Sequence, residues 1–360
     1  MTGHRTSAEQ GKKSGSSLSR PVKFLASLLV VTVVSLATLF VLEFAVRWAI
    51  PAYDPSGHIR FIAGKDERPL LGVANSQQRQ IKNTGDFDVT IRFNKYGFRD
   101  QRDLAKSGFD DYFVTGDSVS FGWGVEETDR VSEQLERIIG KPVYNISIPV
   151  SLDGTKKLID YAEKKGAKIG NLIIFFGTEV RMLDYESPPS PATPSPTVKR
   201  LLSRLKPMLR DNSALYFLFT SFLHRNPFLR NFAIKAGLID PTMEGFPIHE
   251  YDPKAIESTA KYLARFAERK DRRLTVVVLP MRTLWIGPSQ KTEDRILRTF
   301  VARLRELDLD VLDLRLYFED GGRPFQYFFK NDGHWNPAGH AMVGRAVARH
   351  LGFNTEGGKK

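Results

Sequence analysis

Short apolar runs alternate with longer helix-forming stretches between residues 112 and 350, and this alternation constrains the fold more than any other feature. The apolar runs cover residues 112–115, 143–148, 172–176, 274–279 and 311–316. The helix-forming stretches cover residues 131–139, 155–165, 253–270, 289–307 and 337–350. Strands this apolar need cover on both faces, which predicts a parallel sheet between two layers of helices. Ligands of such sheets bind beyond the carboxyl ends of the strands.

A second feature is a run of 19 residues, 24–42, that carries no charge. This length is about what a helix needs to cross a bilayer. The polar residues in the run are scattered and form no polar face. One acidic residue and five basic residues precede it: Glu9, Arg5, Lys12, Lys13, Arg20 and Lys23. This bias predicts a cytoplasmic N-terminus and export of the rest of the chain.

A cleaved signal peptide is the alternative interpretation of residues 24–42. The run is longer than a typical signal-peptide core, and residues 43–48 offer no small-x-small cleavage site. We therefore predict an uncleaved, single-pass signal anchor in a bacterial inner membrane, with the bulk of the chain in the periplasm. The lipid bilayer is then one partner of the protein, through residues 24–42.

Composition narrows the remaining classes of function. The chain has 360 residues, 41% of them apolar, which is room for one large domain with appendages. It has no cysteine, so disulfides and thiolate metal sites are excluded. The net charge is +12, but no nucleic-acid-binding module accompanies it, so we predict no nucleic-acid partner. No histidines pair at metal-ligand spacing, and we expect no metal and no cofactor. An oligomeric state is not indicated.

The chain divides into five predicted segments. Residues 1–23 form a basic cytoplasmic tail, 24–42 the anchor, 43–109 a juxtamembrane extension, 110–352 the α/β domain and 353–360 a C-terminal tail. The domain is interrupted by an insertion at residues 184–250, which starts with a Pro-rich stretch at 187–196 and includes an apolar segment at 214–223. The insertion is compatible with a lid, a membrane-surface element or an ordinary packed subdomain.

Two motifs at opposite ends of the α/β domain carry the chemistry. Gly116-Asp117-Ser118 follows the first apolar run, and Asp332-Gly333-His334-Trp335 lies near the C-terminus. A nucleophilic serine needs a base to take its proton, and a histidine base needs a carboxylate to hold its tautomer. A serine at a strand end with a late Asp/His pair supplies these parts of an acyl-transfer site. Each motif alone is often only a turn with a helix cap.

These residues resemble the SGNH (GDSL-type) hydrolase family over roughly residues 90–352. The flanking segments 94–99 and 143–145 fit the resemblance as well. The resemblance implies a three-layer α/β/α sandwich, the SGNH hydrolase fold, with a five-stranded parallel sheet in flavodoxin-like order. It also implies that Ser118 is the nucleophile, His334 the general base and Asp332 its orienting carboxylate.

The sequence departs from the family pattern in three places. Many members place the aspartate three residues before the histidine, whereas Asn331 stands there and Asp332 lies two before His334. This D-x-H-W spacing resembles the alginate O-acetyltransferase branch. The family's oxyanion asparagine is absent from residues 176–181, and the position of its oxyanion glycine falls on Val150.

Three groups are therefore expected to form the oxyanion hole: the backbone N–H of Ser118, the backbone N–H of Val150 and the hydroxyl of Thr178. An ionised Glu179 next to Thr178 would instead repel the oxyanion. Loss of one donor costs about 10²–10³ in turnover, so a substitute donor matters. Trp123, Glu179, Arg282 and Trp335 lie in or near the functional segments and are candidate substrate-binding residues.

The resemblance implies a serine esterase that acts on an ester or an acylated glycan through a Ser118 acyl-enzyme. The predicted anchor places this activity outside the cytoplasm. Water as acceptor gives hydrolysis, whereas a sugar hydroxyl gives O-acyl transfer to an envelope or exported polysaccharide. The two reactions share every step up to the acyl-enzyme, and the sequence is compatible with both. A third hypothesis is a catalytically weak scaffold or glycan-binding component of polysaccharide assembly, motivated by the altered oxyanion segment.

Overall fold

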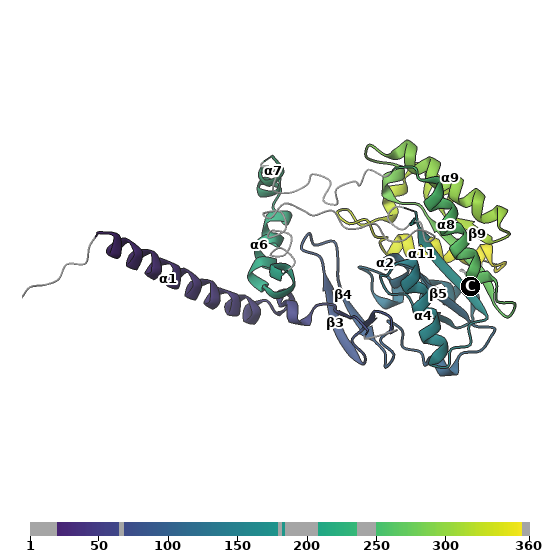
Figure 1. The fold of residues 1–360 in the computed structure, drawn as a ribbon, viewed down its shortest axis with the longest axis horizontal. Coiled ribbons are helices and arrows are strands. Elements are labelled where there is room, and N and C mark those ends of the chain that lie inside the picture. The colour runs from purple at the N-terminus through teal and green to yellow at the C-terminus, as the bar shows by residue number, and fades with distance from the viewer. Residues whose placement is uncertain (1–19, 65–67, 179–181, 184–207, 236–249, 355–360) are drawn as a thin grey trace, which may run out of the picture.

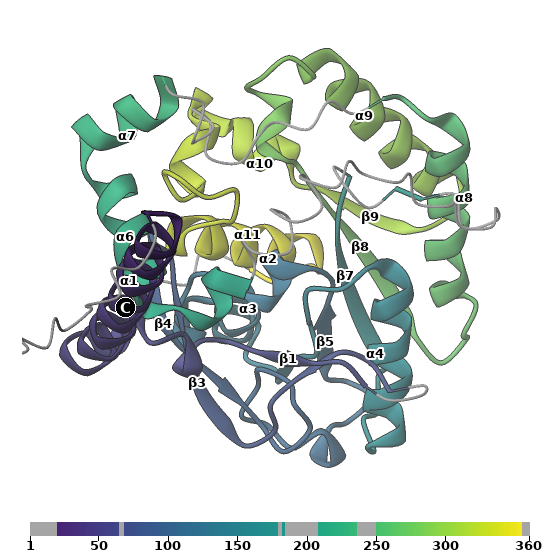
Figure 2. The ribbon, with the colours of Figure 1, turned by 60° about the vertical axis from the view of Figure 1, so that its left-hand side comes forward.

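The computed structural model describes residues 20–64, 68–178, 182–183, 208–235 and 250–354. Its centre is a five-stranded sheet of β5 (Tyr112–Thr115), β6 (Val143–Asn145), β7 (Asn171–Gly177), β8 (Arg273–Leu279) and β9 (Asp310–Asp313). The strand order is β6-β5-β7-β8-β9, and every neighbouring pair is parallel. Figure 2 shows β5, β7, β8 and β9 side by side. This is the flavodoxin-like order, so the predicted sheet is confirmed.

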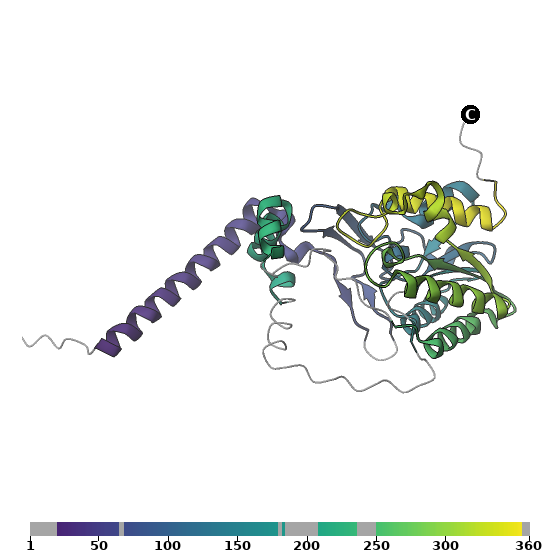
Figure 3. The same cartoon turned by 90° about the horizontal axis from the view of Figure 1, so that it is seen from above.

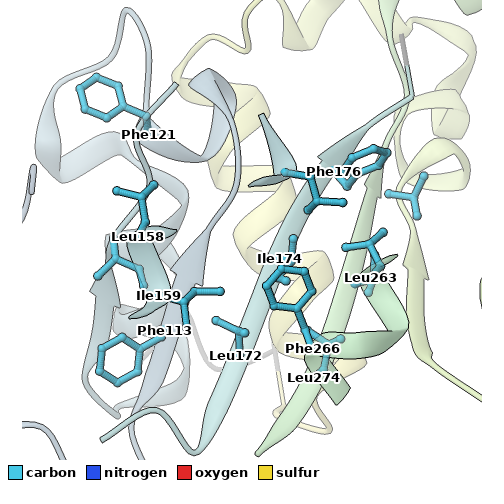
Figure 4. Packing of buried hydrophobic residues seen from close by; sticks show 14 of the residues in the cluster. Phe113, Phe121, Leu158, Ile159, Leu172, Ile174, Phe176, Leu263, Phe266 and Leu274 are labelled. Atoms are coloured by element: carbon cyan, nitrogen blue, oxygen red, sulfur yellow. The ribbon is translucent and has the colours of Figure 1, made fainter. Parts of the chain in front are cut away.

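Two layers of helices cover the sheet. On one face lie α4 (Leu152–Lys164), α8 (Pro253–Ala264) and α9 (Gln290–Glu306), and on the other α3 (Val131–Ile139) and α11 (Pro337–His350). Alternation along β7 divides the core between them. Leu172, Ile174 and Phe176 pack with the first layer, as Figure 4 shows, whereas Ile173 and Phe175 pack with the second. Each buried side chain of this size contributes about 1.5–3 kcal/mol.

The predicted elements occur in the expected order, with one difference in type. The expected strand over residues 311–316 is cut short, because β9 ends at Asp313 and α10 (Arg315–Glu319) begins two residues later. The Asp313 carboxylate accepts the backbone N–H of Arg315 at 2.9 Å and so turns the chain into that helix. Such a bond from an aspartate to the backbone two residues later competes with strand pairing in a run that is otherwise apolar.

The N-terminal run is part of α1 (Arg20–Ala49), which projects from the domain in Figures 1 and 3. Within it, Pro21–Ala49 is the one helix of the described residues that is long and apolar enough to cross a membrane, with a mean hydropathy of 2.6 in its most apolar window. None of that window is buried by the rest of the chain. The helix continues past residue 42, where the predicted anchor ends.

The segment between α1 and the domain forms two antiparallel pairs. β1 (Phe61–Ile62) pairs with β2 (Leu71–Gly72), and β3 (Ser76–Ile81) pairs with β4 (Asp88–Phe93) in a register that joins Ser76 to Phe93 and Ile81 to Asp88. Side chains of β4 join the core cluster of the α/β domain. The β3–β4 hairpin is therefore packed onto the domain and is not a free spacer.

The described part of the insertion forms α6 (Ala214–Arg225) and α7 (Pro227–Lys235). The two helices lie across the domain end of α1 in Figure 1. Phe217 of α6 packs against Tyr53 and His58, which follow α1, with ring centroids 5.0 and 5.3 Å apart. The Pro-rich stretch at 187–196 lies outside the described residues, as do residues 1–19 of the N-terminal tail.

Candidate active site

Ser118 is the first residue of the short helix α2 (Ser118–Phe121), directly beyond the carboxyl end of β5. The Asp117 carboxylate caps this helix by accepting the N–H groups of Val119 at 2.9 Å and Ser120 at 3.4 Å. Gly116 has φ +147°, and a methyl group there would lie 2.3 Å from the carbonyl oxygen of Phe175. Only glycine fits this close approach of residue 116 to β7. Gly116 thereby sets the position of Ser118, two residues later, relative to the sheet.

The structure brings Ser118, His334 and Asp332 together in one chain of hydrogen bonds. His334 Nε2 lies 2.8 Å from Ser118 Oγ, and His334 Nδ1 is hydrogen-bonded to Asp332 Oδ1. The same carboxylate oxygen accepts the backbone N–H of His334 at 3.0 Å. With its proton on Nδ1, the imidazole donates to Asp332 and leaves Nε2 to accept the Ser118 hydroxyl.

Lys82 makes a fourth contact with this chain that sequence reasoning missed. It directly follows β3, and its Nζ donates to Asp332 Oδ2 at 2.5 Å. Burial would raise the pKa of Asp332, whose side chain is 3% exposed, but the His334 hydrogen bond and the Lys82 charge outweigh burial. They hold the pKa of Asp332 below its usual value, so Asp332 is ionised at neutral pH.

The tip of the β3–β4 hairpin also holds the loop that carries His334. Asp86 Oδ1 accepts the backbone N–H of Asn331 at 3.0 Å, and the rings of Phe87 and Phe329 lie 5.2 Å apart. Together with Lys82, these contacts join the hairpin to residues 329–332. No local pattern in the sequence marks them, because the two segments are about 250 residues apart.

The four residues expected near the substrate have different surroundings. Trp123 is half-buried and stacks on His334, with centroids 5.6 Å apart and planes at 24°. Arg282 Nη1 donates to the carbonyl oxygen of Asp332 at 3.2 Å, so it holds the triad loop. Trp335 is 1% exposed and packs against Phe318 in the core, which corrects the expectation that it contacts substrate. Glu179 lies outside the described residues.

The expected oxyanion donors follow the strand ends that neighbour Ser118. Thr178 follows β7 and is buried, and a methyl group on the preceding Gly177 would lie 3.5 Å from an Asp117 oxygen. Val150 is half-buried and lies between β6 and α4, directly before the capping residue Ser151. Both residues therefore stand at the same edge of the sheet as Ser118, and their oxyanion role stays a prediction.

Buried polar side chains donate hydrogen bonds to carbonyl oxygens in and just after α2. Arg99 is fully buried and donates to the carbonyl oxygens of Gly122 at 2.6 Å and Val125 at 2.7 Å. Burial and the neighbouring charge of Arg130 lower its pKa to about 9. Asn145, also buried, donates to the carbonyl oxygen of Ser120 at 2.8 Å. These bonds satisfy the carbonyl groups behind Ser118 and limit its movement.

His340 lies inside α11 and contacts the edge of Trp335 at 5.7 Å between centroids. It is fully buried, and burial together with the charges of Arg99 and Arg130 lowers its pKa to about 3. It is therefore a neutral core residue, as expected for a helix-face histidine. Among the residues that the structure describes, no group of three His, Asp or Glu side chains could hold a metal ion.

Comparison with known proteins gives one family match. Residues 246–359 match the model of the SGNH hydrolase-like domain of the acetyltransferase AlgX. This segment contains Asp332 and His334, and over residues 246–359 the match agrees with the SGNH and AlgX resemblance that the Asp-x-His-Trp motif indicated. No protein of curated function matches the chain at a significant level.

Solved structures similar to the chain include three hydrolases. A lipolytic protein of the G-D-S-L family from Desulfitobacterium hafniense DCB-2 is 13% identical, with 67% of this chain and 99% of that chain covered and a TM-score of 0.36. A catalytic mutant of Axe2, an acetylxylan esterase from Geobacillus stearothermophilus, is 14% identical, with 70% and 98% covered and a TM-score of 0.40. A lipase/acylhydrolase from Enterococcus faecalis is 11% identical, with 69% and 99% covered and a TM-score of 0.35.

Proposed function

We propose that this chain, a member of the SGNH (GDSL-type) hydrolase superfamily, is a serine esterase that forms an acyl-enzyme on Ser118. The observation that carries the proposal is the continuous hydrogen-bonded chain from Ser118 Oγ through the His334 imidazole to Asp332. A serine hydroxyl is a weak nucleophile until an adjacent base takes its proton. The imidazole lies within hydrogen-bond distance of the hydroxyl, and its other nitrogen is held by a buried carboxylate.

The reaction follows from these contacts. Ser118 Oγ attacks the ester carbonyl carbon while its proton passes to His334 Nε2, and Asp332 stabilises the imidazolium. The tetrahedral intermediate then breaks the bond to the leaving alcohol, which takes the proton from Nε2. An acceptor hydroxyl next gives its proton to Nε2 and attacks the acyl-enzyme, and Ser118 Oγ recovers the proton as the product leaves.

The oxyanion of the intermediate is proposed to be held by the N–H groups of Ser118 and Val150 and by the Thr178 hydroxyl. The N–H of Ser118 belongs to the first turn of α2, where an N–H group has no acceptor within the helix. The positions of Thr178 and Val150 at strand ends beside α2 support their assignment.

We further propose that α1 anchors the protein in a bacterial inner membrane, with the N-terminus in the cytoplasm and the α/β domain in the periplasm. Support comes from the exposed apolar surface of α1, its length and the basic residues that precede it. The substrate would then be an ester-linked acyl group outside the cytoplasm.

O-acyl transfer to a polysaccharide is a second candidate function. One observation favours it: the family match is to the domain of an acetyltransferase, and it covers the D-x-H-W segment. Transfer and hydrolysis differ only in the acceptor that attacks the acyl-enzyme. A comparison of water with oligosaccharide acceptors, at a fixed acyl donor, distinguishes them by the product formed.

Labelling with a serine-reactive fluorophosphonate tests the proposed function against the scaffold alternative. The expected result is labelling of the wild-type protein and of Ser120→Ala, and none of Ser118→Ala. Ser120 is a matched control, because it lies in α2 but is buried, with its hydroxyl bonded to the carbonyl oxygen of Asp117. Folded wild-type protein that resists labelling would favour the scaffold, and equal labelling of Ser118→Ala would contradict the nucleophile.

A further inference from the structure

Helices α6 and α7 carry an aromatic face that is open to solvent. On α6 the side chains of Phe219 and Phe222 are 62% and 60% exposed, and on α7 those of Phe228 and Phe232 are 79% and 63% exposed. The spacing of three residues on α6 and four on α7 places each pair on one side of its helix. We call these four residues the aromatic face. Exposed apolar surface of this kind marks a contact with a partner or a membrane.

The first turn of α6 is hydrogen-bonded to α1 at one defined position along that helix. Glu43 accepts hydrogen bonds from the Ser213 hydroxyl at 2.8 Å and from the backbone N–H groups of Ala214 at 2.8 Å and Leu215 at 3.0 Å. Glu43 of α1 therefore pairs with N–H groups that the start of α6 leaves without an acceptor in the helix. Because Glu43 directly follows the charge-free run 24–42, the start of α6 lies at the boundary of the proposed membrane segment.

Phe219 and Phe222 lie on the side of α6 that faces away from Tyr53 and His58. Phe217 packs against Tyr53 and His58, which follow α1 on the side of the α/β domain. At 100° per residue, Phe219 and Phe222 lie on average about 170° from Phe217 around the helix axis. Figures 1 and 3 together show α6 beside the domain end of α1, and in Figure 1 the stack of α6 and α7 runs across the direction of α1.

Charge on this element favours an anionic surface. Residues 208–235 contain one acidic residue, Asp211, and four basic residues: Arg210, Arg225, Arg230 and Lys235. Basic side chains beside exposed aromatic rings are typical of helices that lie in the headgroup region of anionic bilayers.

We propose that α6 and α7 lie in the headgroup layer of the bilayer that α1 enters, with the aromatic face inserted between anionic lipids. This inference rests on the proposed anchoring role of α1. It gives the protein a second membrane contact, in the plane of the membrane, which would fix the orientation of the α/β domain. Arg225 of α6 donates to the carbonyl oxygen of Asn83 at 3.1 Å, next to Lys82. The membrane-bound helix would thereby touch the hairpin tip that holds Asp332.

Depth-dependent fluorescence quenching tests the proposal on the full-length chain. The protein has no cysteine, so Phe222→Cys and Phe228→Cys each give one site for an environment-sensitive dye. The labelled proteins are placed in nanodiscs of phosphatidylcholine and phosphatidylglycerol, about 7:3, with spin-labelled lipids that quench at a shallow or a deep position. Val34→Cys in α1 reports the anchor, and Phe109→Cys, which is 57% exposed before β5, is the control for exposed aromatic positions. Circular dichroism verifies that each variant is folded.

The expected result is strong shallow quenching at positions 222 and 228, deep quenching at 34 and little quenching at 109. Quenching at 34 without quenching at 222 and 228 would overturn the membrane position of α6 and α7 and leave the anchor intact. Absence of quenching at 34 would reject the anchor and this inference together. Equal quenching at 109 and 222 would also overturn the proposal, because the signal would then not depend on the aromatic face.

Discussion

Replacement of Lys82 by methionine should shift the pH dependence of the reaction while leaving Ser118 and His334 in place. Lys82 Nζ and His334 Nδ1 bond opposite oxygens of the Asp332 carboxylate. When the imidazole is protonated, the two cations therefore face each other across one carboxylate. Removal of the Lys82 charge relieves this repulsion and stabilises the imidazolium. The acid limb of the pH–rate profile should therefore move to higher pH.

The size of the shift follows from the geometry. Two like charges about 5 Å apart repel by roughly 3 kcal/mol at an effective dielectric constant of about 20. The Lys82 side chain is 31% exposed, so water screens part of this energy. With about half of the repulsion screened, ~1.4 kcal/mol remains. Loss of that repulsion moves the acid limb by about one pH unit. At pH values above the acid limb, the rate should fall by less than about tenfold. Asp332 keeps both of its bonds to His334, so the imidazole stays largely in position.

The assay is hydrolysis of p-nitrophenyl acetate over a range of pH by wild type, Lys82→Met, Lys82→Arg and Lys95→Met. Lys82→Arg keeps the charge and should restore the wild-type limb. Lys95 offers a matched control, because its Nζ makes a similar bond to Asp103 at 2.9 Å outside the triad. Other charged groups near the triad loop, Arg282 and Asp86, are unchanged in every variant. An acid limb in Lys82→Met that coincides with wild type, or moves to lower pH, would refute the reasoning.

Further predictions concern the nucleophile, the oxyanion hole, the buried histidine and the topology. Ser118→Ala should lower ester turnover by about 10³-fold or more with unchanged circular dichroism, and wild-type turnover would contradict the assignment. Thr178→Val should lower kcat by up to about 10²-fold with little change in KM, because the hydroxyl would donate mainly in the transition state. The pKa of His340 in the folded protein is lowered to about 3. Between about pH 6.5 and 3, His340 is therefore protonated only in the unfolded chain. The free energy of unfolding falls by up to ~1.4 kcal/mol for each pH unit of acidification. Urea unfolding at about pH 7 and pH 4.5 should show a smaller loss in His340→Leu than in wild type, and equal losses would contradict this origin. A C-terminal alkaline phosphatase fusion should be active and a green fluorescent fusion dark, and the reverse pattern would contradict the proposed orientation.

The order and type of the main elements follow from local sequence. Alternation of apolar runs with helical stretches is a property of neighbouring residues, and it predicts the parallel sheet without knowledge of distant contacts. Asn336 followed by Pro337 marks the start of α11, and the structure places that start at Pro337. The Gly-Asp-Ser and Asp-x-His motifs pointed to Ser118, His334 and Asp332 because each motif combines chemistry with a turn at a fixed spacing. Sequence also indicated the charge-free run that lies within α1.

Other parts of the site depend on contacts between segments that are far apart in the chain. No sequence motif includes Lys82 at its hairpin tip, and only the packing of that hairpin on the domain brings it to Asp332. Trp123 and Trp335 both adjoin a motif, yet packing stacks the first on His334 and buries the second in the core. In the same way, Glu43 becomes the cap of α6 only because the insertion folds back onto α1. Local sequence thus determined the elements and the chemistry-bearing residues, whereas the tertiary fold decided which side chains surround them, because packing joins residues that share no local pattern.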